Sequence, residues 1–370
     1  YYGELEVILS FLAFNSITGM SEHHRRAYKL LSGAPQTLSK QGIWTFGAPS
    51  VLGLYLRTGC SLRQTVEDMQ ECMPPYYLLS GWHGAGAAEL TEAEALLLQG
   101  RVDEMDMPLQ KAYYQAEKHG QECITICCDF LEMQRDLCRG VYSSKAEAYS
   151  RYQWQLQPWK QSMVLNTAGI CAGFYYALLG KPEYIPSWLT DGNGQQPSVL
   201  YPARPCRNYI SAQCLLAQGQ YTELLVRWSD WEQECRPYSN FLCLLYLQVQ
   251  RAAAFAGRGD VTSCRASLKQ ALAMAEADKL VLPLAQNIAL LRPYLEQEAQ
   301  GEYSAAAAAA LHLGQQLEAG QGQIMSIRFA EAGLQELTEQ ELQIAQLAAA
   351  RHTNREIAQR LSLSEGTIKP

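Results

Sequence analysis

The chain has 370 residues, a net charge of −7 and 48% hydrophobic side chains. A single core stops growing at roughly 250–300 residues, so this length predicts several domains or a repeat array. Ala, Leu, Gln and Glu are plentiful and strand formers do not dominate, which predicts an all-α fold. The sequence shows neither a run of about 18 apolar residues nor a signal peptide, so we expect a cytoplasmic protein without a membrane partner.

The N-terminal half combines aromatic side chains with glycines, as in residues 42–47 (GIWTFG) and 81–84 (GWHG). Aromatic rings with a polar edge suit a ligand surface, because they stack on flat faces and still form hydrogen bonds. The alternative is that the rings fill space between helices. The pair His23-His24, beside Arg25-Arg26, is expected on a solvated helix face. The candidate ligand-binding residues are Trp44, Trp82, His83, Tyr113 and Tyr114, with Trp82-His83 favoured because flanking glycines leave room for a ligand.

Eight glycines recur at intervals of 39 to 42 residues, namely Gly19, Gly59, Gly100, Gly140, Gly180, Gly219, Gly259 and Gly301. Glycine ends helices because it adopts the left-handed conformation without a Cβ clash. Two short helices cannot bury their apolar faces alone, whereas stacked pairs do so and build a superhelix with a concave inner surface. The pattern resembles the tetratricopeptide repeat, with a unit longer than the usual roughly 34 residues. We assign residues 1–320 to this helical-repeat domain.

Twelve cysteines are scattered along the predicted helices without a C-x-x-C pair, which indicates reduced core thiols rather than a disulfide framework. The sequence contains no H-E-x-x-H, no G-x-S-x-G and no cluster of His and carboxylates at ligand spacing. Gly180-Lys181 is followed by Pro182 and lacks the Ser or Thr of a phosphate loop. We therefore expect no enzyme, no catalytic residue, no metal site and no cofactor in this chain.

Residues 337–370 predict two short helices and the start of a third. Thr338 with Glu341, and Thr353 with Glu356, match the capping box, in which a hydroxyl and a carboxylate each bind a free backbone amide. Apolar residues at helical spacing mark one face of each helix: Ile344, Leu347 and Ala348, then Ile357, Ala358 and Leu361. A third helix capped by Ser364 would complete the arrangement of a helix-turn-helix that binds DNA.

These residues resemble the DNA-binding segment of LuxR-type transcriptional regulators, which carries L-T, a Glu three residues later, S/T-N-K/R-E-I-A and S-x-x-T-V/I-K. The matching positions are Leu337, Thr338, Glu341, Thr353, Asn354, Arg355, Glu356, Ile357, Ala358, Ser364, Thr367, Ile368 and Lys369. The resemblance implies a bacterial transcription regulator whose DNA-binding residues include Asn354, Arg355, Ser364, Thr367, Ile368 and Lys369.

Two positions depart from the family pattern. Arg351 stands where Gly is usual, and the recognition helix stops at Pro370. We therefore expect residues 337–370 to be a truncated helix-turn-helix that binds DNA weakly or not at all, preceded by a linker at residues 321–336. This segment is neutral, so the whole net charge of −7 lies in residues 1–336. An acidic body is not expected to bind a phosphate backbone, since that affinity comes from clustered Lys and Arg.

The combination of repeats and helix-turn-helix is similar to the MalT-like branch of LuxR-type regulators, and residues 38–52 and 259–285 look like their sensor regions. Those proteins place a nucleotide-binding switch domain first, a helical-repeat sensor next and the helix-turn-helix last. The resemblance implies a piece of a longer protein, with an ATP-binding domain upstream of Tyr1 as a partner and ATP as the cofactor of that domain alone. In this hypothesis a small molecule or protein effector binds the repeat groove and controls DNA binding. The alternative is a scaffold whose groove binds a peptide or partner protein.

Overall fold

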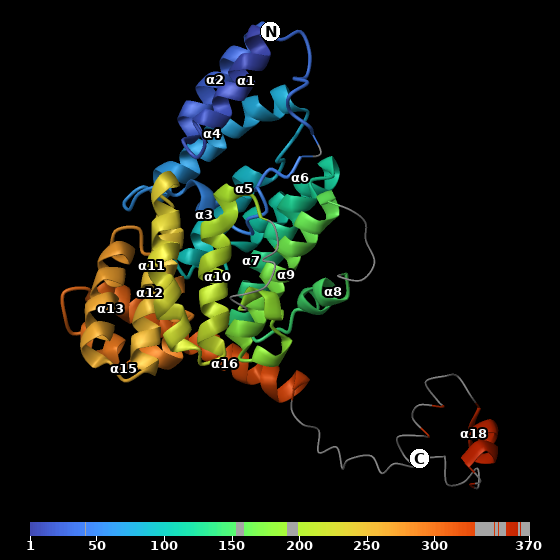
Figure 1. Ribbon diagram of the computed structural model, residues 1–370, viewed down its shortest axis with the longest axis vertical. Coiled ribbons are helices and arrows are strands. Elements are labelled where there is room, and N and C mark those ends of the chain that lie inside the picture. The colour runs from blue at the N-terminus through green and yellow to red at the C-terminus, as the bar shows by residue number, and fades with distance from the viewer. Residues whose placement is uncertain are drawn as a thin grey trace. The chain divides into compact units, whose positions relative to one another are not determined.

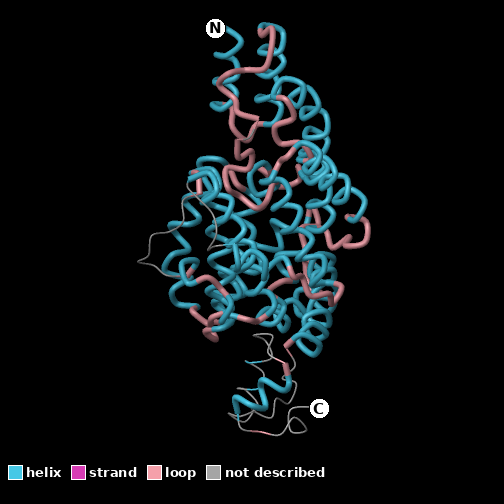
Figure 2. The backbone as a smooth tube through the Cα atoms, turned by 90° about the vertical axis from the view of Figure 1, so that its right-hand side faces the viewer, coloured by secondary structure: helices cyan, strands magenta, loops and turns pink. Residues whose placement is uncertain are grey.

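The computed structural model describes residues 1–40, 42–152, 159–190, 199–329, 344, 347, 353–361 and 363. These residues form helices and loops without a strand, which confirms the all-α prediction (Figure 2). The chain divides into two compact units, Tyr1–Ile324 and Met325–Pro370. Within the described ranges, no helix has the length and apolar character needed to cross a membrane.

The helices are α1 Tyr2–Leu12, α2 Ile17–Leu30, α3 Leu52–Tyr55, α4 Leu62–Ser80, α5 Ala87–Leu98, α6 Asp106–His119, α7 Glu122–Cys138, α8 Lys145–Tyr152, α9 Trp159–Leu179, α10 Arg204–Ala217, α11 Tyr221–Cys235, α12 Phe241–Gly257, α13 Val261–Glu276, α14 Leu282–Ala285, α15 Ile288–Glu298, α16 Ser304–Arg328 and α18 Asn354–Leu361 (Figure 1). Short 3-10 helices lie at Pro182–Tyr184, Ser187–Leu189, Tyr201–Ala203 and Arg236–Tyr238. A linker was expected at 321–336, but residues 321–328 are the last turns of α16.

Helices α5 to α13 form a repeat array, in which helices pack on the next one along the chain and several also on the next but one. Five of the eight predicted glycines end these helices with φ between +70° and +76°: Gly100, Gly140, Gly180, Gly219 and Gly259. At each one, the following residue donates its backbone N–H to the carbonyl five residues back at 2.9 Å, as Arg101 does to Leu96. This is the Schellman motif, and it confirms the physical reason for the glycine series.

The prediction that these glycines end helices is wrong at both ends of the glycine series. Gly19 lies inside α2, and neither Gly59 nor Gly301 has a left-handed φ. The intervening helices of the array end in the same way at Gly120 and, without glycine, at Ser239 and Lys279. Left-handed turns therefore end most of the described array helices, and only some of these turns use glycine. Residues 1–80 are not repeats, because α1, α2 and α4 form a separate lobe that packs around Val7, Ala27 and Leu79.

A buried stretch of the chain, residues 46–56, which contains α3, lies inside the array and is here called the inner segment. Its apolar members Ala48, Val51, Leu52, Leu54 and Leu56 are fully buried. Successive repeat helices bind its backbone carbonyls: Cys127 of α7 donates to Ala48, Thr167 of α9 to Gly47, and Asn240, just before α12, to Gly53. The concave surface that the sequence analysis left for a ligand is therefore occupied by the protein's own backbone.

The array also closes on itself around the inner segment. The short helix α14 packs against α5, and Gln99 after α5 donates to the carbonyl of Asp278 at 3.0 Å. Gln286 donates to Gln134 of α7 at 2.9 Å. The two ends of the array are thus joined by direct contacts.

Glu94 of α5 holds the turn in the middle of the inner segment. This carboxylate is 4% exposed and accepts the backbone N–H groups of Val51 at 3.0 Å and Leu52 at 2.9 Å. The Ser50 hydroxyl donates to it at 2.5 Å. Burial raises the pKa of Glu94 to about 7, although the three hydrogen bonds oppose that rise. A buried carboxylate is costly, and its retention here follows from the two amides that it satisfies.

Helix α16 lies across the turns that end α7 and α9. A Cβ atom added to Gly140 would come within 2.6 Å of Gln323, and one added to Gly180 within 2.9 Å of Gln321. The approach between α16 and the array is closest at Gly320 of α16, where an added Cβ would lie 1.9 Å from the carbonyl oxygen of Leu137. Glycines therefore allow α16 to dock directly on the array, and the same helix continues past Ile324 into the second unit.

We predict that Glu94→Ala lowers the free energy of unfolding by about 3 kcal/mol or more, because two buried N–H groups lose their acceptor at roughly 1–3 kcal/mol each. Glu94→Gln keeps an acceptor oxygen and should retain most of the stability at pH 7. Denaturant unfolding of the three proteins tests this. Equal stability of the Ala and Gln variants would show that Glu94 does not hold the inner segment through these bonds.

Candidate functional site

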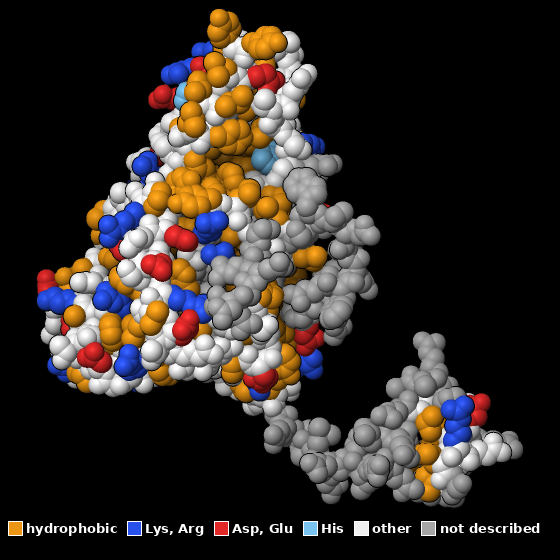
Figure 3. Space-filling view, viewed as in Figure 1, with side chains coloured by type: hydrophobic (Ala, Val, Ile, Leu, Met, Phe, Trp, Pro, Cys, Tyr) orange, Lys and Arg blue, Asp and Glu red, His pale blue; other side chains and the backbone are white. Residues whose placement is uncertain are grey.

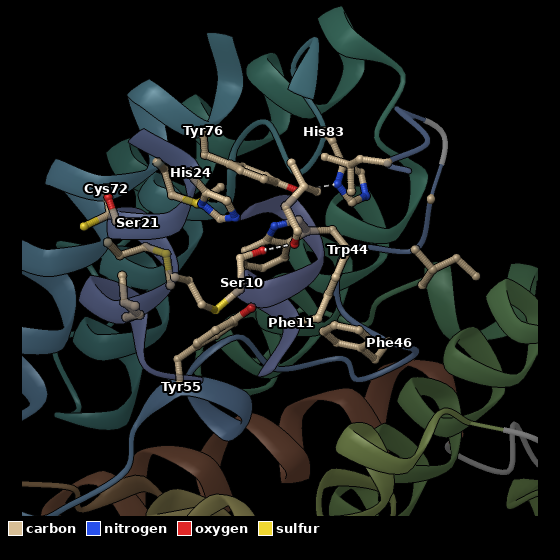
Figure 4. Close-up of a pocket in the computed structure, with 18 of the residues that line it drawn as sticks. Ser10, Phe11, Ser21, His24, Trp44, Phe46, Tyr55, Cys72, Tyr76 and His83 are labelled. Carbon is tan, nitrogen blue, oxygen red and sulfur yellow. Dashed lines mark hydrogen bonds between the residues drawn. The ribbon is translucent and has the colours of Figure 1, made fainter. Parts of the chain in front are cut away.

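A cavity of about 200 Å³ lies between α1, α2 and α4 and the loop that leads into the inner segment (Figure 4). Most of its walls are apolar or aromatic. The described lining residues are Val7, Ser10, Phe11, Ile17, Met20, Ser21, His24, Leu38, Ser39, Gly42, Ile43, Trp44, Phe46, Tyr55, Met69, Cys72, Met73, Tyr76 and His83. Hydrophobic side chains also gather around this lobe in the space-filling view (Figure 3).

The polar groups of the cavity differ in how they are satisfied. The Ser10 hydroxyl donates to the Val7 carbonyl at 2.6 Å, and the Tyr76 hydroxyl lies 2.7 Å from Nδ1 of His83. By contrast, the buried Ser21 hydroxyl has no hydrogen-bond partner among the described residues. Because buried polar groups are nearly always paired, the Ser21 hydroxyl is a group in this wall that is available to a ligand.

His24 lies one turn after Ser21 on α2 and packs its ring 4.6 Å from that of Tyr76. Burial lowers the pKa of His24 to about 4, with the neighbouring His23 as a smaller cause. The imidazole is therefore neutral at pH 7. Burial raises the pKa of both Tyr55 and Tyr76 above the usual range, so both phenols stay protonated.

The aromatic wall connects the cavity to the inner segment. Trp44 stacks on Tyr55 at 5.5 Å, and Phe46 packs edge-on against Phe14 at 5.0 Å. Phe46 and Tyr55 belong to the inner segment itself. Any molecule in the cavity would therefore contact the same stretch of chain that the repeat helices hold.

The five residues predicted to bind a ligand do not all lie together in the structure. Trp44 and His83 line the cavity. Trp82 does not: it is 38% exposed and stacks between Tyr77 and His119, with its ring 4.1 Å from that of His119. The space beside the glycines in the GWHG motif is also filled, because a Cβ on Gly84 would lie 2.5 Å from the Trp44 ring.

The other two candidates, Tyr113 and Tyr114, lie on α6. Tyr114 is 61% exposed, with Lys118 over its ring. The Tyr113 hydroxyl lies 2.6 Å from Asp129 and 2.8 Å from Glu132, so its single hydrogen is donated to one carboxylate at a time, and Lys145 pairs with both. This cluster joins α6, α7 and α8 and satisfies its own charges. In the described part of the chain, no group of three or more His, Cys, Asp or Glu residues could hold a metal ion.

The sequence analysis missed Ser21, His24 and Tyr76. His23-His24 was expected on a solvated face, but only His23 is partly exposed, where it pairs with Glu6 at 2.6 Å. His24 is 8% exposed. Its spacing could have revealed this, since Ser21, His24 and Ala27 recur every three residues and form the buried face of α2. All twelve cysteines are free in the structure, and most of them are buried.

The second unit contains the predicted DNA-binding segment, in which α18 is the described helix. Its capping box is confirmed: the N–H of Thr353 donates to Glu356 at 2.8 Å, and the N–H of Glu356 donates to the Thr353 hydroxyl at 3.3 Å. Ile357 and Ala358 are buried, as the apolar spacing predicted. Asn354 and Arg355 open the helix. The positions that fall outside the described residues are Leu337, Thr338, Glu341, Ala348, Arg351, Ser364, Thr367, Ile368, Lys369 and Pro370.

The described residues form an all-helical array and, after it, a capped helix with apolar residues at helical spacing. This order is typical of a protein with a C-terminal helix-turn-helix. Residues 335–370 match the family described as bacterial regulatory proteins, luxR family. The match confirms the LuxR-type helix-turn-helix and indicates a transcription regulator that binds DNA. No curated protein sequence matches the chain.

We predict that Thr353→Ala destabilises α18 by about 1 kcal/mol, because the N-cap acceptor is lost. Amide hydrogen exchange of residues 354–361 should speed up about fivefold, whereas Thr353→Ser should exchange like the parent. If the Ala and Ser variants exchange at the same rate, the capping box does not stabilise the helix.

We predict that the His24 environment makes the protein less stable as pH falls from 6.5 to about 4. The folded pKa is depressed, so the unfolded state binds a proton that the folded state does not, and the loss reaches about 3 kcal/mol. Thermal unfolding of the parent and of His24→Gln across this range measures the effect. The difference between the two curves should shrink as pH falls, and parallel curves would contradict the shift.

Proposed function

We propose that the protein is a bacterial transcription regulator in which the helix-turn-helix binds DNA and the first unit senses an effector. The luxR-family match of residues 335–370 is the observation that carries this proposal. The distribution of charge supports it, because the acidic excess lies outside residues 337–370. DNA contact is therefore assigned to the second unit, and the first unit has another role. We place the regulator in the cytoplasm and assign it no catalytic residue, metal or cofactor of its own.

The effector site in this proposal is the cavity of the N-terminal lobe rather than the inner surface of the array. A ligand there would touch Trp44, Phe46 and Tyr55, and the last two belong to the inner segment. The inner segment is bound by α5, α7 and α9, and α16 docks on the turns that end α7 and α9. Effector binding shifts the array only if it differs in strength between two arrangements of these contacts. The MalT-like organisation, with an upstream ATP-binding partner domain, belongs to this proposal.

A protein-interaction scaffold is the second candidate, and one observation favours it. Helix α1 exposes a row of large apolar side chains, namely Tyr2, Leu5, Ile8 and Leu12. These positions form a continuous apolar face, which is unusual for a surface helix without a partner. In this case the partner protein would bind α1 and not the interior of the array, because the inner segment occupies that surface.

DNA binding is tested by selecting duplexes from a random pool at low salt, where phosphate contacts are strongest. We expect Arg355→Ala and Lys369→Ala each to weaken binding at every sequence and to reduce the salt slope by about 1. The sequence analysis predicts weak binding by residues 1–370 alone, so the slope is more informative than the affinity.

The matched control is Arg258→Ala, which removes an exposed charge from the turn after α12. It should leave both the affinity and the salt slope unchanged. An equal loss in Arg258→Ala, or a salt slope that neither Arg355→Ala nor Lys369→Ala reduces, would refute the assignment of DNA contact to the helix-turn-helix.

A further inference from the structure

We infer that the cavity of the N-terminal lobe binds a small neutral aromatic molecule, a single substituted ring whose one hydroxyl or carbonyl group hydrogen-bonds to Ser21. The inference deepens the proposed function by naming the ligand class of its effector site. Its role in controlling DNA rests on that proposal, whereas the binding itself rests on the cavity.

The size of the cavity sets the first limit. Its volume is about 200 Å³. An apolar protein cavity of about 150 Å³ holds benzene, so this one has room for a single ring with a short substituent. Pockets for larger ligands start at roughly 300 Å³, which excludes nucleotides and oligosaccharides.

The charge of the lining sets the second limit. The described lining residues include no Lys, Arg, Asp or Glu. Two histidines line the cavity: burial keeps His24 neutral at pH 7, and His83 lies 2.7 Å through Nδ1 from the Tyr76 hydroxyl. A carboxylate or phosphate would lose its hydration here without an opposite charge in return, which is costly. The ligand is therefore neutral.

The walls select an aromatic ring among neutral molecules. Trp44, Tyr55 and Tyr76 present ring faces or edges from different elements, and rings prefer to pack against rings in offset or edge-on geometry. Met20, Met69 and Met73 complete the wall with flexible thioethers, which adapt to a ligand and contact aromatic edges favourably.

A polar anchor completes the site. Ser21 is 2% exposed, and its hydroxyl has no partner among the described residues. The Ser10 hydroxyl faces the same cavity but is already bonded to Val7. A ligand with one hydroxyl or carbonyl group would satisfy Ser21, and that bond would orient the ring in an otherwise apolar space (Figure 4).

The test is calorimetric titration of the protein at pH 7 with benzyl alcohol, toluene and benzoate. We expect benzyl alcohol to bind at least fivefold more tightly than toluene and benzoate to bind least. Ser21→Ala should lower the affinity for benzyl alcohol at least fivefold and leave the affinity for toluene unchanged. The matched variant Ser10→Ala, in the same wall, should leave the affinities for both probes unchanged. Trp82→Ala, which lies outside the cavity, should also leave both affinities unchanged. Thermal unfolding of each variant confirms that it is folded.

The inference is overturned if benzoate binds as well as benzyl alcohol, if neither neutral probe binds, or if Ser10→Ala and Ser21→Ala act alike. A separate arm measures DNA binding of the protein with and without benzyl alcohol. Ser21-dependent binding of benzyl alcohol with unchanged DNA affinity would support the ligand class and refute effector control by this cavity. A DNA-binding salt slope that neither Arg355→Ala nor Lys369→Ala reduces, with the ligand titration intact, would refute the proposed DNA function alone.

Discussion

A loop and short helix buried among other helices must find partners for their backbone amides and carbonyls, and the first unit is arranged around that requirement. The inner segment has lost access to water, and each unpaired group would cost free energy. Glu94 accepts two of its N–H groups, and Thr167, Asn240 and the backbone N–H of Phe241 donate to its carbonyls. These bonds come from helices far apart in the chain. The repeat array is therefore held together partly through the segment that it encloses, in addition to the packing of neighbouring helices.

The inner segment also links the N-terminal cavity, the repeat array and α16, which are the parts that the proposed function needs. The inner segment carries Phe46 and Tyr55 into the cavity wall, and its central turn is bound by α5. Helix α16 docks through Gly320 onto α7, so close that an added Cβ atom would overlap the α7 backbone. The N-terminal cavity, the array and the helix that leads to the second unit are thus joined by direct contacts within one compact unit.

Features that depend on neighbouring residues were predictable. The Schellman turns at Gly100, Gly180 and Gly259 follow from local backbone geometry, and the capping box of Thr353 with Glu356 spans only three residues. The helix-turn-helix itself was recognisable because its caps and apolar spacing lie within a short segment. The same local reasoning failed where glycine was not required, as at Ser239 and Lys279, whose left-handed turns are made by other residues. It also failed at Gly19, which α2 accommodates within its interior.

The sequence by itself determined that the chain is all-helical, that it contains a LuxR-type DNA-binding segment and where many of its helices end, because these properties arise from interactions between residues close in the chain. Only the tertiary structure decided that residues 46–56 fill the array, that His24 is buried while Trp82 is not, and that Trp44 and His83 share a cavity. Those outcomes depend on which surfaces meet after folding. A helix face such as that of Ser21 and His24 looks polar in sequence, and its burial follows from the apolar walls that α1 and α4 bring to it.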